Sequence, residues 1–325
     1  MALSQAWGRF APRARYAGDQ VPLPFVCGLN MTYEDVGEKS VEISQPSDGL
    51  EKRQATIHLT FRPVKMKPVA EGGNKRKDRE PEVSRDAEKP RAVLVFRGAG
   101  KRISAVEKAA WHKDVDVIFQ KKAWVDRTVA KRIVEDSLSK HFGEHHYDEH
   151  SKKFESTIML LDNLDAQKNE EAFVAPLRAV GSEGYFYPGG ETDALAPVDA
   201  GYGNDVKLEY GTEMDAWVSA PGNIDKWENT PGNGGLTASD RRVLMTHWVA
   251  AAKARVDKKL YSLWRYFEKT GALITTDGSG DDKIEMPKYP EGVTSCDYDE
   301  ASQRDVDEAA MWAAGRVAKK MKAES

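Results

Sequence analysis

Three aspartates in short, well-separated segments are the residues of this chain best suited to catalysis. Asp19 lies in AGDQVPLPF, Asp162 directly follows the apolar run IMLL, and Asp199 lies in LAPVDAG. A buried strand that ends in a carboxylate aims a rigid ligand at a cation. Mg²⁺ prefers hard oxygen ligands and keeps several of its waters, so three carboxylates are enough to hold it. The pattern therefore indicates a metal-dependent enzyme that cuts or joins nucleic acid backbones.

A histidine-rich segment, HFGEHHYDEH, is a second candidate site. Its histidines form two pairs with a spacing of four residues, His141 with His145 and His146 with His150. On a helix this spacing would aim both rings of a pair in one direction, as in zinc sites. Gly143 weakens a helix here, so we favour a hydrated loop over a metal site.

The bulk composition is that of a globular protein in a reducing compartment. The chain has 325 residues, of which 40% are hydrophobic and 31% are charged. No apolar run approaches the roughly 18–20 residues that cross a bilayer, so we expect no membrane contact. The cysteines, Cys27 and Cys296, are too few for a disulfide framework or a zinc knuckle.

The charge distribution offers one candidate surface for nucleic acid. A formal net charge of −4 is unusual for a protein that contacts phosphates, but residues 97–132 are rich in lysine and arginine. A charged run is most often a solvated face. Two short stretches nevertheless combine cations with a glycine-rich turn or a tryptophan that could stack on a base. The candidate contact residues are Arg97, Lys101, Arg102, Lys121, Lys122 and Trp124.

The elements around the aspartates alternate between strands and helices, which predicts an α/β fold. Pro22 and Pro24 follow Asp19, so we expect any strand there to end at or just after Asp19. Residues 123–142 place apolar side chains, Trp124 included, on one helical stripe. Strands are predicted at 55–61, 91–98, 115–120 and 156–163, and helices at 197–218, 237–256, 258–270 and 299–322.

Seven blocks of sequence, in this order, resemble the DDE superfamily endonucleases, transposase-derived proteins of the pogo, jerky and centromere-protein-B group. The resemblance extends from about Trp7 to Ile284. The blocks are AGDQVPLPF, LEKRQATIHLTF, VLVFRGAGKRIS, FQKKAWVDRTV, MLLDNLDAQ, APVDAG and LTASDRRVLMTHWV.

The resemblance implies a ribonuclease-H-like α/β fold, with a mixed five-stranded sheet flanked by helices and followed by C-terminal helices. Asp19 would close the first strand, Asp162 would close the fourth, and Asp199 would lie near the start of a helix. These three residues would be both the catalytic residues and the ligands of Mg²⁺ (or Mn²⁺). DNA is the implied partner, with a possible homodimer and a nuclear location.

The same resemblance suggests how the chain is divided. Residues 1–18 form an N-terminal lead, with the helix-turn-helix DNA-binding region of the family missing. Residues 19–220 form the catalytic domain, and its highly charged segment 68–90 is expected to be a disordered insertion. Residues 236–284 correspond to the C-terminal helical extension of the family, and residues 285–325 form a variable tail with an amphipathic helix.

Two departures from the family pattern leave the function open. Ala196 stands where the family usually has Gln, and Gln167 stands where many members have His. These changes keep the three aspartates but affect expected substrate contacts. The main alternative is therefore a catalytically inactive or domesticated nucleic-acid-binding relic of a transposase. A second alternative is a protein-interaction module, favoured by the acidic net charge and the C-terminal helix.

Overall fold

The computed structural model describes residues 7–24, 54–64, 89–148, 150–188 and 195–285. The predicted insertion at 68–90 falls almost wholly outside these ranges, and the predicted helix at 299–322 falls wholly outside them. Cys27 and Cys296 also lie outside the described residues.

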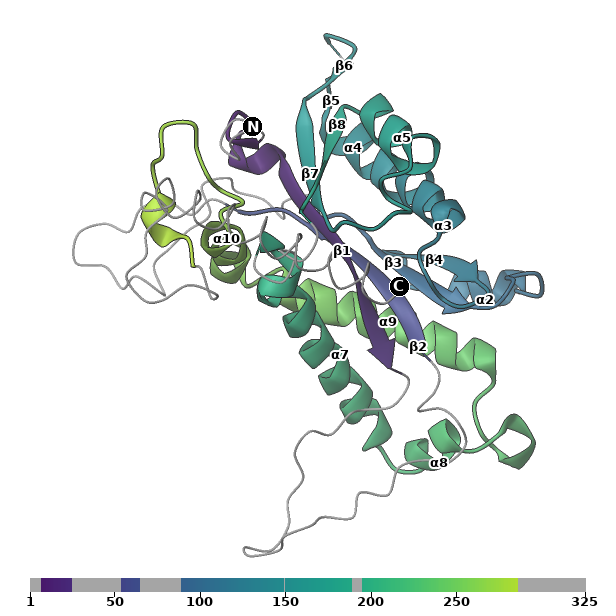
Figure 1. Ribbon diagram of the computed structural model, residues 1–325. Helices are drawn as coiled ribbons and strands as arrows, with labels where there is room; N and C mark the ends of the chain where they lie inside the picture. Colours follow the sequence, from purple (N-terminus) through teal and green to yellow (C-terminus); the bar gives the residue numbers. More distant parts are fainter. Residues whose placement is uncertain (1–6, 25–53, 65–88, 149, 189–194, 286–325) are drawn as a thin grey trace, which may run out of the picture.

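A mixed six-stranded sheet forms the centre of the fold (Figure 1). Its strands are β1 (Arg15–Pro24), β2 (Gln54–Phe61), β3 (Ala92–Arg97), β4 (Val115–Gln120), β7 (Thr157–Leu161) and β8 (Ser182–Phe186). They lie in the order β4-β3-β2-β1-β7-β8 across the sheet. β2 is antiparallel to both β1 and β3, whereas β1–β7, β3–β4 and β7–β8 are parallel pairs. A separate hairpin joins β5 (Tyr147–Asp148) and β6 (Lys153–Phe154).

This topology confirms the ribonuclease-H-like α/β fold expected from the sequence. β1, β2 and β3 form an antiparallel unit, and β7 and β8 extend the sheet in parallel from the β1 side. The sheet has one strand more than the five expected, because β4 adds to the outer edge of β3.

The expectation that the first strand ends at or just after Asp19 is wrong. β1 continues to Pro24, and its last residues pair with β2. β7 pairs with β1 only from Arg15 to Gly18, so beyond Gly18 the described residues place no strand on that side of β1. A proline, which has no N–H to donate, is tolerated where one side of a strand is unpaired.

Helices cover both faces of the sheet, as Figure 1 shows. Successive residues of a strand point to opposite faces, and each face forms its own apolar core. One core contains Ala17 and Val21 of β1, and the other contains Tyr16. The first core is covered by α7 (Gly203–Val218), α9 (Ala238–Val256) and α10 (Leu260–Lys269). The second core is covered by α3 (Arg127–Arg132), the helical continuation Ile133–Leu138, α4 (Ser139–His145) and α5 (Ala175–Ala179).

Two helix starts show how the sequence sets these elements. Thr237 and Asp240 form a capping box at the start of α9, where a helix was predicted, and each side chain accepts a hydrogen bond from the backbone N–H of the other. Asp126 caps α3 by accepting a hydrogen bond from the N–H of Val129 (2.9 Å). Trp124 therefore precedes the helix and is 73% exposed, so its predicted place on the apolar stripe is wrong.

The guanidinium of Arg15 ties the two ends of the described chain to the sheet. It is 1% exposed and donates hydrogen bonds to the carbonyls of Gly8, Phe10, Ala272 and Ile274 at 2.7–3.2 Å. The segment before β1 and the segment after α10 are thereby fixed to the same strand. Among the described residues, no helix is both long and apolar enough to cross a membrane.

We predict that Arg15→Met destabilises the fold by about 3 kcal/mol or more, because it leaves buried carbonyls without donors. Urea unfolding measures the change. Arg9→Met is the matched control, because Arg9 makes an exposed ion pair with Glu183 and lies over the ring of Phe10, and is expected to contribute less than about 1 kcal/mol. Equal losses in the two variants would contradict the anchoring role of Arg15.

Candidate active site

The register of three parallel strands brings Asp19 and Asp162 side by side. Gly18 of β1 pairs with Leu161 of β7, and Leu161 in turn pairs with Phe186 of β8. The residues that follow Gly18, Leu161 and Phe186 are Asp19, Asp162 and Tyr187. The N–H of Tyr187 donates to the carbonyl of Leu161 (3.0 Å), which holds this row together. Neighbouring strands are about 4.8 Å apart, so the two carboxylates arise from adjacent positions at one edge of the sheet.

Alternation along β1 and β7 sets the face of these side chains. Ala17 and Val21 lie in the core beneath α7, so Asp19, midway between them in β1, points to that same face. On β7, Ile158 and Leu160 belong to this core, and Asp162 continues their spacing. Both carboxylates therefore lie on the face that α7 covers.

Asp199 approaches the same face from the helical turn Val198–Tyr202 that leads into α7. Val198 and Tyr202 are buried in the core, while Asp199 is on the exposed side of the turn. Gly203 allows close contact with β1, since an added Cβ would lie 3.0 Å from a methyl of Val21. Gly201 has a φ of +146°, and a Cβ there would lie 2.5 Å from the ring of Tyr266.

The charges of Asp162 and Asp199 act on the carboxyl of Asp19. Asp19 is 8% exposed, and its pKa is raised to about 7, first by burial and then by the charges of Asp199 and Asp162. The N–H of Gln20, which donates to the Asp19 carboxylate (2.7 Å), opposes this rise in pKa. A buried acid beside two further acids is a site where a cation would relieve repulsion.

The donor chemistry of this site fits a hard divalent cation, because all three side chains offer carboxylate oxygens. The described residues hold no group of three or more His, Cys, Asp or Glu side chains already gathered in a ligand shell. The three aspartates are thus positioned by separate elements on one face.

Tyr187 is a member of the site that the sequence analysis missed. Its side chain is 2% exposed, and its hydroxyl has no hydrogen-bond partner among the described residues. The pKa of the phenol is raised well above its usual value, by burial first, then by Tyr185 and by the charges of Asp19 and Asp199. Only the strand register places Tyr187 beside Asp162, so the sequence carries no local signal for it.

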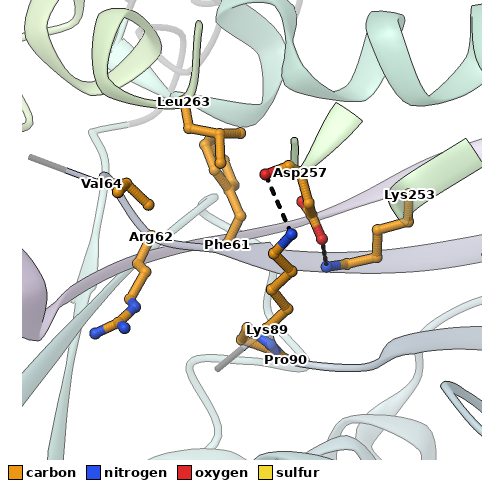
Figure 2. Close-up of a pocket in the computed structure, with 8 residues that line it drawn as sticks. All are labelled: Phe61, Arg62, Val64, Lys89, Pro90, Lys253, Asp257 and Leu263. Carbon is orange, nitrogen blue, oxygen red and sulfur yellow. Dashed lines mark hydrogen bonds and ion pairs between the residues drawn. The ribbon is translucent and has the colours of Figure 1, made fainter. Parts of the chain in front are cut away.

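A buried cluster around Asp257 anchors the turn that carries Asp199. The Tyr202 hydroxyl donates to one carboxylate oxygen of Asp257 and the Lys253 ammonium to the other, both at 2.8 Å. Figure 2 shows Lys253 on this carboxylate and Lys89 on the backbone carbonyl of Asp257, the latter at 3.2 Å. Tyr202 also stacks on Phe61 of β2, with ring centroids 3.9 Å apart.

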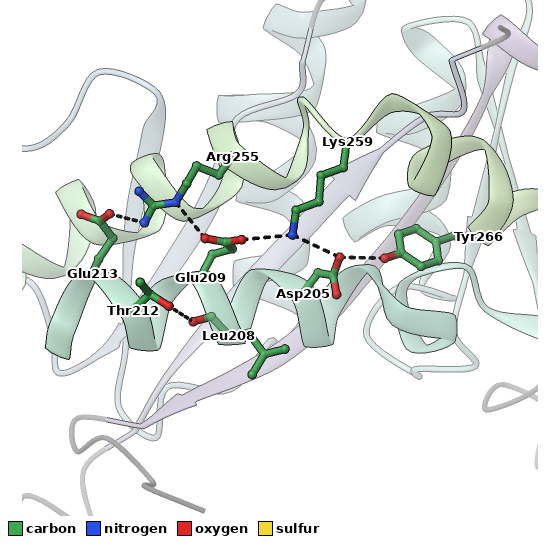
Figure 3. A network of polar contacts seen from close by, with 8 residues as sticks. All are labelled: Asp205, Leu208, Glu209, Thr212, Glu213, Arg255, Lys259 and Tyr266. Atoms are coloured by element: carbon green, nitrogen blue, oxygen red, sulfur yellow. Dashed lines mark hydrogen bonds and ion pairs between the residues drawn. The ribbon is translucent and has the colours of Figure 1, made fainter. Parts of the chain in front are cut away.

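A second set of contacts, drawn in Figure 3, fastens α7 to α9 and α10. Arg255 bonds to Glu209 and Glu213, and Lys259 lies between Glu209 (3.0 Å) and Asp205 (3.7 Å). The Tyr266 hydroxyl donates to Asp205 (2.9 Å). Both sets of contacts restrain α7 and the turn before it, which carries Asp199.

The candidate DNA-contact residues lie on two loops at the same edge of the sheet as the aspartates. β1, β3 and β4 run in one direction, so their carboxyl ends meet at one edge. The loop after β4 is tied to β2 by a hydrogen bond from the Thr56 hydroxyl to the Ala123 carbonyl (2.7 Å), and Thr56 lies opposite Pro22 of β1. All six residues are exposed, and no ion pair between described residues involves the five cations. The loop surface consists of Arg97, Lys101, Arg102, Lys121, Lys122 and Trp124.

The expectation of a hydrated loop at the histidine-rich segment is wrong. α4 continues through Gly143 to His145, and His141 and His146 are buried against the Tyr16 hydroxyl at 3.1 and 2.6 Å. Gly143 lies on the exposed side of the helix, where its small size costs no packing. Burial lowers the pKa of His141 to about 2, so this ring is neutral and belongs to the core.

No family model and no curated protein matches the sequence. Solved structures similar to the chain include a pre-cleavage Mos1 transpososome and a Mos1 mariner paired-end complex with Mn. The first is 12% identical with a TM-score of 0.36 and covers 77% of this chain; the second is 11% identical with a TM-score of 0.37 and covers 80%. The chain spans a little over half the length of those chains, 56% and 59%. Both TM-scores are below 0.5, so we base the functional proposal on the three acids themselves.

We predict that Asp19→Asn removes part of the pH dependence of stability. The folded pKa of about 7 lies above the unfolded value of 3.8, so the fold binds this proton more tightly than the unfolded chain does. The stability that Asp19 contributes is complete below about pH 4 and is lost as pH rises through about 7, a change of a few kcal/mol.

Urea unfolding without divalent ions, between about pH 4 and pH 8, measures this difference. The free energy of unfolding of Asp19→Asn should exceed that of the wild type at the alkaline end and approach it at the acid end. Buried His58, whose pKa is lowered to about 4, is common to both proteins and cancels. Parallel pH profiles would show that the Asp19 carboxyl is not perturbed.

Proposed function

We propose that this chain is a DDE transposase-type endonuclease domain that hydrolyses or transfers phosphodiester bonds of DNA. The observation that supports the proposal is the convergence of Asp19, Asp162 and Asp199. Asp19 and Asp162 come from adjacent parallel strands, and Asp199 comes from a helical turn over the same face. The charges of Asp162 and Asp199 raise the pKa of Asp19.

In this proposal Asp19, Asp162 and Asp199 would be the ligands of two Mg²⁺ (or Mn²⁺) ions. Such ions would supply charge stabilisation to the attacking and the leaving oxygens of an in-line displacement. The attacking oxygen is that of water in hydrolysis or of a DNA 3′-hydroxyl in strand transfer, so the protein needs no nucleophile of its own.

The rigid elements explain how the acids are aimed. Asp19 is built into β1 between two core residues, and Asp162 follows β7, all of whose residues are buried. The turn bearing Asp199 is held from beneath by Tyr202 and Asp257. A mobile chain would lose the geometry that catalysis by positioning requires.

The loop surface of five cations and Trp124 is the proposed DNA contact. Its cations lack ion-pair partners among the described residues and are therefore available to phosphates. Trp124, 73% exposed beside Lys121 and Lys122, offers a ring face for a base. A homodimer and a nuclear location remain part of the proposal through the family resemblance of the sequence.

We predict that Asp162→Asn abolishes plasmid nicking in Mg²⁺ or Mn²⁺ but preserves DNA binding, because the amide cannot replace a charged ligand. A supercoiled-plasmid assay measures nicking, and fluorescence anisotropy of a labelled duplex measures binding. Asp165→Asn is the control, because this nearby side chain is 99% exposed and lies outside the row.

The same assay distinguishes the other functions. Wild-type protein that binds DNA in a salt-sensitive way but never nicks it would be the inactive relic. Wild-type protein that binds no DNA at low salt would favour the protein-interaction module. Nicking that persists in Asp162→Asn would rule out the proposed metal site.

We predict that the double variant Lys121→Ala/Lys122→Ala weakens DNA binding about equally for all sequences. If both lysines contact phosphates, the slope of log K against log salt should fall by about 2. Titrations at several salt concentrations measure it. The matched control is Lys140→Ala/Lys153→Ala, exposed lysines in α4, which covers the other face of the sheet, and in β6, which should leave the slope unchanged. Equal slopes in all three proteins would place the DNA elsewhere.

A further inference from the structure

The row formed by Asp19 and Asp162 has a third member whose chemistry is unused. Tyr187 follows β8 just as Asp162 follows β7, because Phe186 pairs with Leu161. Its ring belongs to the same core as Ala17 and Val21, so it lies on the face of the two acids.

The hydroxyl of Tyr187 is a buried donor without an acceptor. The side chain is 2% exposed, and no described residue accepts or donates a hydrogen bond at this oxygen. An unsatisfied buried hydroxyl is costly, typically about 1–3 kcal/mol, so most such groups have a partner in the functional state. The strand register puts Tyr187 next to Asp162, and its ring lies on the face to which Asp19 points.

We propose that the Tyr187 hydroxyl donates a hydrogen bond to a non-bridging oxygen of the phosphodiester bound at the three aspartates. This inference rests on the proposed function, since it assigns the phosphate-binding group of that same site. The aspartates supply only negative charge, and a phosphate oxygen brought among them needs a donor in addition to the cations.

Packing fixes the direction of the donor. The ring of Trp7 meets that of Tyr187 edge to face, with centroids 6.4 Å apart, and Tyr185 does the same at 6.2 Å. Trp7 is itself anchored by a hydrogen bond from its indole N–H to the Gly271 carbonyl (3.2 Å). These contacts hold the ring of Tyr187 at one position in the core.

Tyr187→Phe tests the assignment, because it removes one oxygen and keeps the ring. We expect binding of a labelled duplex in Ca²⁺ to weaken about 10-fold and plasmid nicking in Mg²⁺ to slow by about 10- to 100-fold. The free energy of unfolding should stay the same or rise, because a buried hydroxyl without a partner is lost. A merely structural role for the hydroxyl predicts the opposite change in stability.

Tyr185→Phe is the matched control. It lies on the same strand and the same face, packs against Tyr187, and stands two residues before the row. Its binding and nicking should equal those of the wild type.

The outcomes separate this inference from the proposed function. If the wild type nicks DNA and Tyr187→Phe binds and nicks equally well, the inference is overturned and the endonuclease stands. If the wild type binds without nicking and Tyr187→Phe binds more weakly, the phosphate contact stands and the nuclease fails. A wild type that neither binds nor nicks overturns both.

Discussion

The parallel pairing of β1 with β7 is the constraint on which the proposed site depends. Because Gly18 lies opposite Leu161, Asp19 and Asp162 are neighbours, and a shift of one residue would turn one of them to the opposite face. The register is fixed by burial on both sides, since Ala17 and Leu160 enter one core while Tyr16 and Met159 enter the other. The same apolar pattern that forms the sheet therefore sets the spacing of the acids.

The third acid depends on a different kind of contact. Asp199 lies on a helical turn, and its position follows from buried side chains beneath it. Tyr202 stacks on Phe61 of the sheet and bonds to Asp257 at the end of α9, so the turn is fixed to two elements at once. The ion-pair network along α7 adds restraint at the surface, where each exposed pair contributes little by itself.

Much of this arrangement was predictable from local patterns, and the exceptions have physical reasons. The apolar run before Asp162 predicted a strand with an acid at its exit, and Thr237 with Asp240 predicted the start of α9. The continuation of β1 through Pro22 was not predictable, because it depends on which side of the strand lacks a neighbour. Burial of His141 and exposure of Trp124 likewise depend on tertiary contacts. Tyr187 could be found only after the strands were paired.

The buried polar groups of this fold fall into two kinds, and the difference bears on function. Arg15 and Asp257 are buried with charged or dipolar partners: four carbonyls surround the first, and Tyr202 and Lys253 hold the second. Such groups hold segments of the chain together. Asp19 is buried beside like charges and accepts a hydrogen bond from the N–H of Gln20, and the hydroxyl of Tyr187 is buried with no partner among the described residues. Neither the buried carboxyl of Asp19 nor the buried hydroxyl of Tyr187 strengthens the fold. Both residues lie on one row at one edge of the sheet. Local conflicts of this sort are expected where a structure must receive a ligand, and a cation with a phosphate would supply what both residues lack.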